Sequence, residues 1–131
     1  MNNIVKLGDI ADFINGFAFK PSDWNGNGKK IIRIQNLTDS TKPYNSTDKP
    51  VDTKYVVHKG DLLVSWSATL GVFEWKEASA LLNQHIFKVV PDESIVIKPF
   101  LKYSINQAIN KMERYTHGST MKHINRREFL D

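Results

Sequence analysis

The spacing of apolar residues changes near Pro99, and this change limits the fold more than any other feature of the sequence. Upstream of it, apolar residues come in short runs rich in β-branched and aromatic side chains. Downstream they recur at three- and four-residue steps, at Leu101, Ile105, Ala108, Ile109 and Met112. Pro99 suits the first turn of a helix, and Gly118 suits the position just past its end. The pattern predicts an amphipathic helix over about residues 99–116.

Several upstream segments predict strands. In IIRIQNL (31–37), Ile32 and Ile34 fall on one face and Arg33 and Gln35 on the other. The segment KGDLLVSWSATLG (59–71) alternates in the same way, and its strand is expected to end at Gly71. VFEW and HIFKVV supply two further β-rich runs.

The segment KLGDIADFINGF predicts a short N-terminal amphipathic helix, because its apolar residues keep helical steps and Asp9 and Gly16 can cap it. These residues are Leu7, Ile10, Phe13, Ile14 and Phe17. Residues 38–58 are polar, with two prolines, and predict a long surface loop. Together the segments indicate an α+β domain with a twisted mixed or antiparallel sheet, and 131 residues suit a single domain over 1–131.

The net charge of +4 is concentrated near the C-terminal end. Residues 111–127 have a net charge of +4, because Glu113 is the single acidic residue among five basic ones: Lys111, Arg114, Lys122, Arg126 and Arg127. Such a cluster suits a phosphate-facing surface, which gains affinity from counterion release. It equally suits the cationic end of a helix, where Lys and Arg favour the negative end of the helix dipole.

Residue patterns for catalysis, cofactors or metals are missing from the sequence. NGNGKK lacks the spacing of a phosphate-binding loop and precedes a strand rather than a helix. The four histidines (58, 85, 117 and 123) form no metal-binding pair, and there is no cysteine. The serines of SWSATLG lie outside any nucleophile elbow. No apolar run reaches the roughly 18 residues of a membrane span, which favours a cytoplasmic protein.

A binding role is indicated by HGSTMKHIN (117–125), which follows the predicted helix and precedes Arg126 and Arg127. Its hydroxyl, lysine, histidine and amide side chains are those that commonly bond phosphate oxygens. The same residues can also form a helix-terminating turn, in which Ser119 and Thr120 satisfy free backbone groups. Asn125 and Glu128 then predict a capping box for one more short helix.

Six segments, in order, resemble the target recognition domain of type I restriction-modification specificity subunits. They are KLGDIADFINGFAFK (6–20), IIRIQNL (31–37), KGDLLVSWSATLG (59–71), LLNQHIFKV (81–89), FLKY (100–103) and HGSTMKHINRREFL (117–130). The resemblance implies a non-catalytic domain that reads one half of a bipartite sequence in double-stranded DNA. It also implies methyltransferase subunits that use S-adenosylmethionine and, through them, an ATP- and Mg-dependent translocase and endonuclease subunit.

The chain departs from that family's pattern at its end. It stops at Asp131, where the resemblance implies a proline-rich turn and a long spacer helix, and it holds no sustained heptads. We therefore expect a recognition domain without the spacer coiled coil or a second recognition domain. Docking of partners through that helix is correspondingly in doubt.

The resemblance also divides the polar residues into two groups. Expected backbone contacts are Ser119, Thr120, Lys122, His123 and Arg126, with Lys20 and the neighbouring Lys29 and Lys30 as weaker additions. Expected base contacts lie in the stretches 38–58 and 72–80: Lys42, Tyr44, Asn45, Lys49, Lys54, Trp75 and Lys76. Arg33 and Gln35 suit either task.

Two other functions fit the same residues. The chain is also compatible with a target recognition domain cut from a DNA methyltransferase or a fused restriction enzyme. Alternatively, it is a protein-interaction module that has lost DNA binding and docks an acidic partner through residues 111–127.

Overall fold

Two four-stranded sheets form the centre of the molecule. The computed structural model describes residues 7–39, 41–67 and 69–116, with side chains for all of these except 66, 67, 69, 70 and 112–116. The first sheet has the order β1-β8-β5-β6 and is antiparallel throughout. Its strands are β1 (Ala11–Asn15), β5 (Leu62–Ser67), β6 (Thr69–Glu74) and β8 (Ile86–Pro91).

The second sheet has the order β3-β2-β7-β4 and is mixed, because β2 and β7 run parallel. Its strands are β2 (Lys29–Ile32), β3 (Asn45–Thr47), β4 (Val56–Val57) and β7 (Ala80–Leu82). The short helix α1 (Leu7–Ile10) precedes β1, and the short helix α2 (Ile34–Thr38) and the 3-10 turns η1 (Pro21–Asp23) and η2 (Thr53–Tyr55) connect strands. The α+β class predicted from the sequence is confirmed, although the strands divide between two sheets rather than one.

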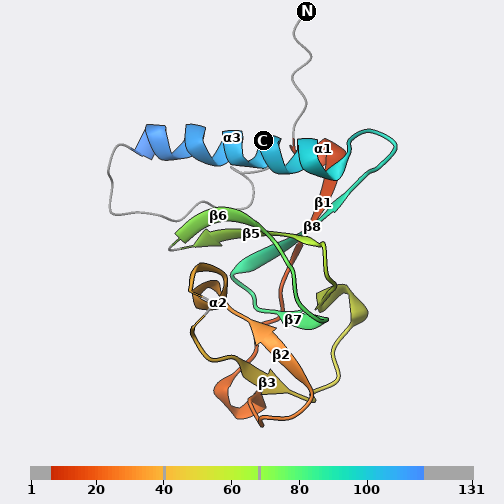
Figure 1. The fold of residues 1–131 in the computed structure, drawn as a ribbon, viewed down its shortest axis with the longest axis vertical. Helices are drawn as coiled ribbons and strands as arrows, with labels where there is room; N and C mark the ends of the chain where they lie inside the picture. The colour runs from red at the N-terminus through yellow and green to blue at the C-terminus, as the bar shows by residue number, and fades with distance from the viewer. Residues whose placement is uncertain (1–6, 40, 68, 117–131) are drawn as a thin grey trace, which may run out of the picture.

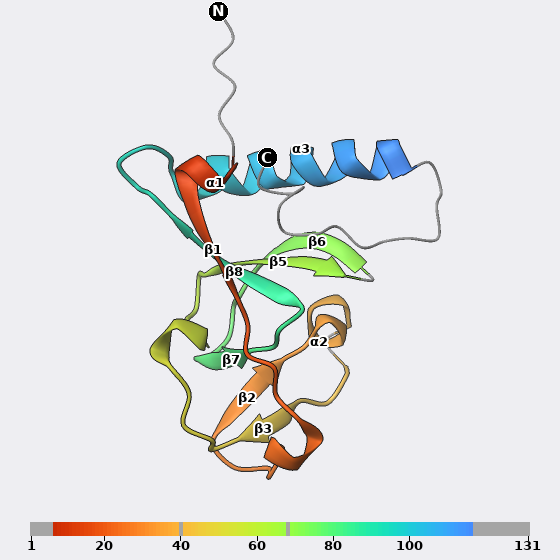
Figure 2. The same cartoon turned by 180° about the vertical axis from the view of Figure 1, so that it is seen from behind.

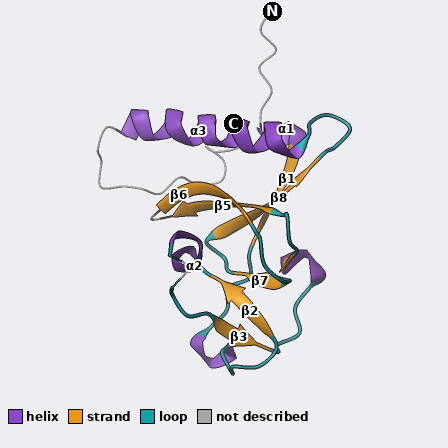
Figure 3. Cartoon of the chain, in the orientation of Figure 1, coloured by secondary structure: helices purple, strands orange, loops and turns teal. Residues whose placement is uncertain are grey.

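The long helix α3 (Lys98–Thr116) covers the outer face of the first sheet (Figure 1). The predicted helix is therefore confirmed, and its apolar stripe faces the sheet: Leu101, Ile105 and Ile109 are buried against Phe13, Val64 and Phe87. The helix and the two sheets form successive layers, with the second sheet on the far side from α3 (Figure 3). None of the helices in the described ranges has the length and apolar character that a membrane span requires.

Two further clusters enclose the second sheet, because its strands alternate between them. Ile32, Val57 and Leu82 face the first sheet, where they pack with Leu63 and Ile86. Ile31 and Leu81 face the opposite side, where they pack with Phe19. The central strands of this sheet are thus buried on both faces.

The chain after β1 joins the two sheets (Figure 2). The amide of Gly16 donates to the Ile86 carbonyl at 3.1 Å, and that of Phe17 donates to the Leu82 carbonyl at 2.8 Å. A Cβ on residue 16 would come within 2.5 Å of the Leu82 carbonyl oxygen and closer still to Asn83, so this crossing requires glycine. The buried Lys88 adds a second link, since its Nζ donates to the Val56 carbonyl at 2.8 Å.

The predicted N-terminal helix is wrong beyond its first turn. Only Leu7–Ile10 are helical, and Ala11–Asn15 pair with β8 as a strand. Ala11 and Phe13 are buried while Asp12 is exposed, so the same residues also fit a period of two. Pairing with β8 and the edge-to-face contact between Phe13 and Phe87, 6.0 Å apart, outweigh the helical spacing.

Two strand predictions and one loop prediction also need correction. The strand in IIRIQNL ends at Ile32, and the alternation of Ile34 with Gln35 belongs to α2, where Ile34 and Leu37 pack beside Ile32. Residues 38–58 are not a continuous loop, since β3, η2 and β4 lie within them. The single strand predicted in 59–71 is replaced by two antiparallel strands, β5 and β6. Gly71 therefore lies inside β6 opposite Ser65, where it leaves room for the Phe73 ring. The predicted β-rich runs VFEW and HIFKVV are confirmed as parts of β6 and β8.

Candidate nucleic-acid interface

Most of the predicted DNA-contacting residues that the structure describes lie on or around the second sheet. Because side chains alternate along β2, Lys30 and Ile32 share one face, and Lys29 and Ile31 share the other. The polar residues therefore divide into groups on two faces, with a third group at the turn between β7 and β8.

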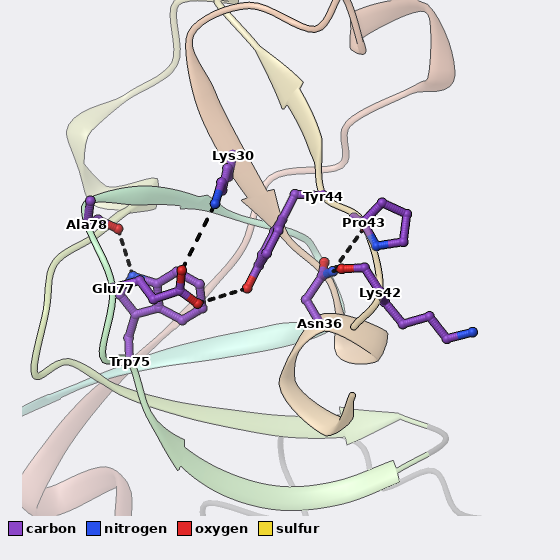
Figure 4. A network of polar contacts seen from close by, with 8 residues as sticks. All are labelled: Lys30, Asn36, Lys42, Pro43, Tyr44, Trp75, Glu77 and Ala78. Carbon is purple, nitrogen blue, oxygen red and sulfur yellow. Dashed lines mark hydrogen bonds and ion pairs between the residues drawn. The ribbon is translucent and has the colours of Figure 1, made fainter. Parts of the chain in front are cut away.

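The first group surrounds Tyr44 (Figure 4). The Tyr44 hydroxyl donates to Glu77 Oε2 at 3.2 Å, and Lys30 Nζ lies 4.0 Å from Glu77 Oε1 and 4.6 Å from the centre of the Tyr44 ring. Burial raises the pKa of Tyr44, and the negative charge of Glu77 together with the hydrogen bond to it act in the same direction. Tyr44 is thereby held as a neutral phenol with its ring edge fixed.

Trp75, predicted to contact a base, belongs to the core beneath this group rather than to the surface. Its side chain is 4% exposed and packs with Ile32 and Leu63. The indole Nε1 donates to the Ala78 carbonyl at 2.9 Å, and the ring meets Tyr44 edge to face at 6.3 Å. The enclosed indole packs beneath the Tyr44 ring, whereas the neighbouring Lys76 is exposed.

The turn that leads into Tyr44 is held from below by Asn36. This buried amide accepts from the Arg33 backbone N–H at 3.0 Å and donates to the carbonyls of Lys42 and Pro43, at 3.4 and 3.2 Å. The exposed Lys42 side chain therefore projects from a fixed backbone (Figure 4). Asn45 follows at the start of β3, half-buried and paired with Ile31.

The second group lies on the opposite face. Lys49 Nζ pairs with Asp23 at 3.2 Å and lies 5.8 Å from the centre of the Phe17 ring. Phe17 meets Tyr55 at 5.4 Å, and Lys54 Nζ lies 5.1 Å from the centre of the Tyr55 ring. These lysines are cations placed over aromatic rings, an arrangement that limits their motion.

Lys20 contributes to the second group through its backbone. Its N–H donates to Asp23 at 2.8 Å, and this bond, with a smaller effect of Lys49, lowers the pKa of Asp23. The Asp23 carboxylate therefore stays charged and bonds both the residue before η1 and Lys49, while the Lys20 side chain is exposed.

The third group lines a cleft of about 300 Å³ between α2 and the turn from β7 to β8. Arg33 and Gln35, both predicted to contact DNA, line it together with Trp24. The Arg33 guanidinium lies 5.3 Å from the centre of the Trp24 ring. The other polar lining comes from Asn83, Gln84 and His85, which lie in the family-like segment 81–89 and are not among the DNA contacts predicted from the sequence. Three consecutive polar residues between two apolar strands are the signal that would have revealed them.

The predicted backbone contacts Ser119, Thr120, Lys122, His123 and Arg126 lie outside the described residues, as does the predicted capping box at Asn125. Among the residues that the structure describes, no three His, Cys, Asp or Glu side chains gather as metal ligands would.

Two solved structures share this fold. One, from work on complex assembly and conformational transition of the type I R-M system, has a TM-score of 0.67 at 18% identity, over 97% of this chain and 32% of that one. The other, the HsdS subunit of Thermoanaerobacter tengcongensis, has a TM-score of 0.61 at 20% identity, over 97% of this chain and 31% of that one. The chain thus shares the fold of about a third of each of these two proteins.

The sequence defines the family more narrowly. The chain belongs to the type I restriction modification DNA specificity domain family, whose sequence pattern matches residues 2–131. It is 30% identical over 130 residues to the type I restriction enzyme EcoBI specificity subunit of Escherichia coli. That match covers 97% of this chain but 27% of the relative, so the chain spans about a quarter of it.

Proposed function

We propose that this chain is a sequence-specific DNA-binding domain that reads one half of a bipartite DNA target and directs methyltransferase and endonuclease partners to it. The match of the specificity-domain family over residues 2–131 carries this proposal. The arrangement of the second sheet supports it, because lysines from β2 and from residues 42–54 lie on both of its faces.

The described groups suggest a division of roles. Exposed cations at Lys20, Lys42, Lys49, Lys54 and Lys76 attract the duplex, and each phosphate they neutralise adds to affinity by releasing a counterion. Asn45, Arg33 and Gln35 offer the amide and guanidinium groups that distinguish base edges in the major groove. Tyr44 and Trp75 hold the surface in shape. Ser119, Thr120, Lys122, His123 and Arg126 remain proposed contacts to the DNA backbone.

In this proposal the chain performs no chemistry and needs no cofactor of its own. S-adenosylmethionine, ATP and Mg would serve the partner subunits, and the complex would act on DNA in the cytoplasm. A single domain of this size should bind DNA weakly, at the ~10⁻⁴ to 10⁻⁶ M typical of non-specific contacts at physiological salt. Useful specificity then comes from joining two half-sites on one assembly.

The decisive experiment exchanges residues 38–58 for those of a family member with a different target. The full-length subunit carrying the exchange is assembled with its methyltransferase subunits, and methylated adenines are mapped on genomic DNA. We expect one half of the target to change and the other half to stay. A matched exchange of residues 92–97, in the connection between β8 and α3, should leave the target unchanged. Methylation at the original sites after the first exchange would refute the proposal.

A further inference from the structure

The group formed by Lys30, Tyr44 and Glu77 places a carboxylate on a surface that is otherwise expected to attract DNA (Figure 4). The Tyr44 hydroxyl donates to one carboxylate oxygen of Glu77 at 3.2 Å, and Lys30 Nζ lies 4.0 Å from the other. The side chains of Glu77 and Lys30 are 55% and 53% exposed, so a ligand can reach both. Tyr44 and Glu77 belong to the stretches 38–58 and 72–80, in which the sequence predicts base contacts.

The stability of the fold does not account for this group. A separation of 4.0 Å is too long for a hydrogen bond between Lys30 and Glu77, and exposed ion pairs contribute only about 0–1 kcal/mol. An exposed carboxylate also repels the phosphates that the surface lysines attract. It favours binding only where it accepts a hydrogen bond, and in the major groove the donors are amino groups of the bases.

The group is held in place before any ligand binds. Trp75 Nε1 donates to the Ala78 carbonyl at 2.9 Å, which closes the turn that carries Glu77. The buried Trp75 ring meets the Tyr44 ring edge to face at 6.3 Å, and Lys30 Nζ lies 4.6 Å from the centre of the Tyr44 ring. Side chains that are already placed lose less entropy when they bind a ligand.

Glu77 and Lys30 offer an acceptor and a donor side by side, which match the major-groove edge of one C·G base pair. The N4 amino group of cytosine is a donor, and O6 and N7 of the paired guanine are acceptors. Cytosine N4 and guanine O6 are neighbours, because they bond each other within the pair. A carboxylate accepts about four hydrogen bonds, and Tyr44 supplies one of them to Glu77. At 4.0 Å, Glu77 also leaves the donors of Lys30 available.

The same two side chains suit an A·T base pair less well. The N6 amino group of adenine lies between two acceptors, its own N7 and O4 of the paired thymine. Lys30 can donate to one of these acceptors, and the other is left facing the Glu77 carboxylate. In a C·G pair the cytosine N4 has an acceptor on one side only, and the C5–H of cytosine lies on its other side.

We infer that Glu77 and Lys30 together read one C·G base pair in the major groove, with Glu77 accepting from cytosine N4 and Lys30 donating to the paired guanine. This inference rests on the proposed function. It adds Glu77 to the residues that determine the target, and it gives Lys30 a base contact in place of the backbone contact expected from the sequence. Tyr44 is a positioning residue that acts through Glu77.

The first test selects sequences from a randomised duplex library with the 131-residue chain at low salt. Wild type should enrich a motif with cytosine at a fixed position. Glu77→Gln keeps the side-chain shape and should reduce the preference for that cytosine about ten-fold, because an amide pairs better with adenine. Glu93→Gln, in the exposed connection between β8 and α3, removes the same charge and should select the wild-type motif. Both variants should melt within about 2 °C of wild type.

The second test changes the DNA instead of the protein. N4-methylcytosine still pairs with guanine, but a methyl group replaces the N4 proton that faces the major groove. Wild-type affinity should fall about ten-fold when the selected cytosine carries this methyl group. Glu77→Ala lacks the carboxylate and should bind the methylated and unmethylated duplexes equally.

The outcomes separate the two proposals. If the wild-type chain retains no duplex at low salt, the proposed function fails. The inference about Glu77 is overturned, while DNA binding stands, if the chain binds DNA but enriches no cytosine or if Glu77→Gln keeps the cytosine preference. An equal loss of that preference in Glu93→Gln, or an unchanged wild-type affinity for the methylated duplex, overturns it as well.

Discussion

Replacing Trp75 by alanine tests whether this residue stabilises the core or contacts DNA bases. The structure removes 96% of its surface from solvent, packs it between Ile32 and Leu63, and bonds its Nε1 to the Ala78 carbonyl at 2.9 Å. Truncating a buried aromatic of this size costs about 3–5 kcal/mol, which includes the loss of the edge-to-face contact with Tyr44. The melting temperature of a domain of this length changes by roughly 3–4 °C per kcal/mol, so we expect the melting temperature to fall by about 10–20 °C.

Thermal unfolding followed by circular dichroism measures this shift, with Lys76→Ala as the neighbouring control. Lys76 is exposed, so its variant should melt within about 2 °C of wild type. Trp75→Phe retains an aromatic ring, should melt between the two, and should select the same DNA motif as wild type. If Trp75→Ala melted within about 3 °C of wild type, or if Trp75→Phe changed the motif, the core assignment would be refuted.

Three further predictions concern the crossing, the phenol and the basic segment. Gly16→Ala should destabilise the fold by about 1–3 kcal/mol or more in urea titrations, because its Cβ would meet backbone atoms that cannot move aside; a neutral effect would contradict the crossing. The stabilisation from the neutral Tyr44 phenol is present below pH 10 and is lost as pH rises through the raised pKa of Tyr44. The free energy of unfolding, measured between pH 8 and 11, should therefore decline less in Tyr44→Phe than in wild type. Equal declines in the two proteins would contradict the environment described for Tyr44. Lys122→Ala and Arg126→Ala should each weaken binding to all duplexes alike and flatten the log–log salt slope by about one unit, as gel shifts at several salt concentrations would show; an unchanged slope would remove either residue from the backbone contacts.

The parts of the fold that sequence predicts are those in which one period persists. The apolar stripe of α3 keeps one helical period from Leu101 to Met112, within a helix of 19 residues. The helix predicted in the N-terminal segment is wrong because the same apolar residues fit both a helix and a strand. Only the pairing of β1 with β8 selects the strand. The predicted end of strand β2 is wrong for another reason. Ile31 and Ile32 are both fully buried, so these residues show no polar face that would mark the end of the strand.

The surface lysines follow from composition, but the cleft does not. Charged side chains are almost always exposed, so predicting Lys42, Lys54 and Lys76 at the surface required no tertiary information. The cleft depends on the parallel pairing of β2 with β7, which places Arg33 beside residues 83–85. Local periodicity carries no record of a contact between segments so distant in the chain.

The parallel pairing of β2 with β7 affects which segments of the chain can determine the DNA target. Segments before β2, between β2 and β4, and between β7 and β8 all end at the second sheet, while α3 and its core stabilise the first. In the proposed function, the contacts to DNA are shared among these three segments, which are not contiguous in sequence. Residues 38–58 contribute one of these, and the turn 83–85 is fixed by bonds to β2 and β8 that an exchange of 38–58 does not touch. We therefore predict that transfer of a relative's complete half-target requires more than residues 38–58, because the segment before β2 stays in place otherwise.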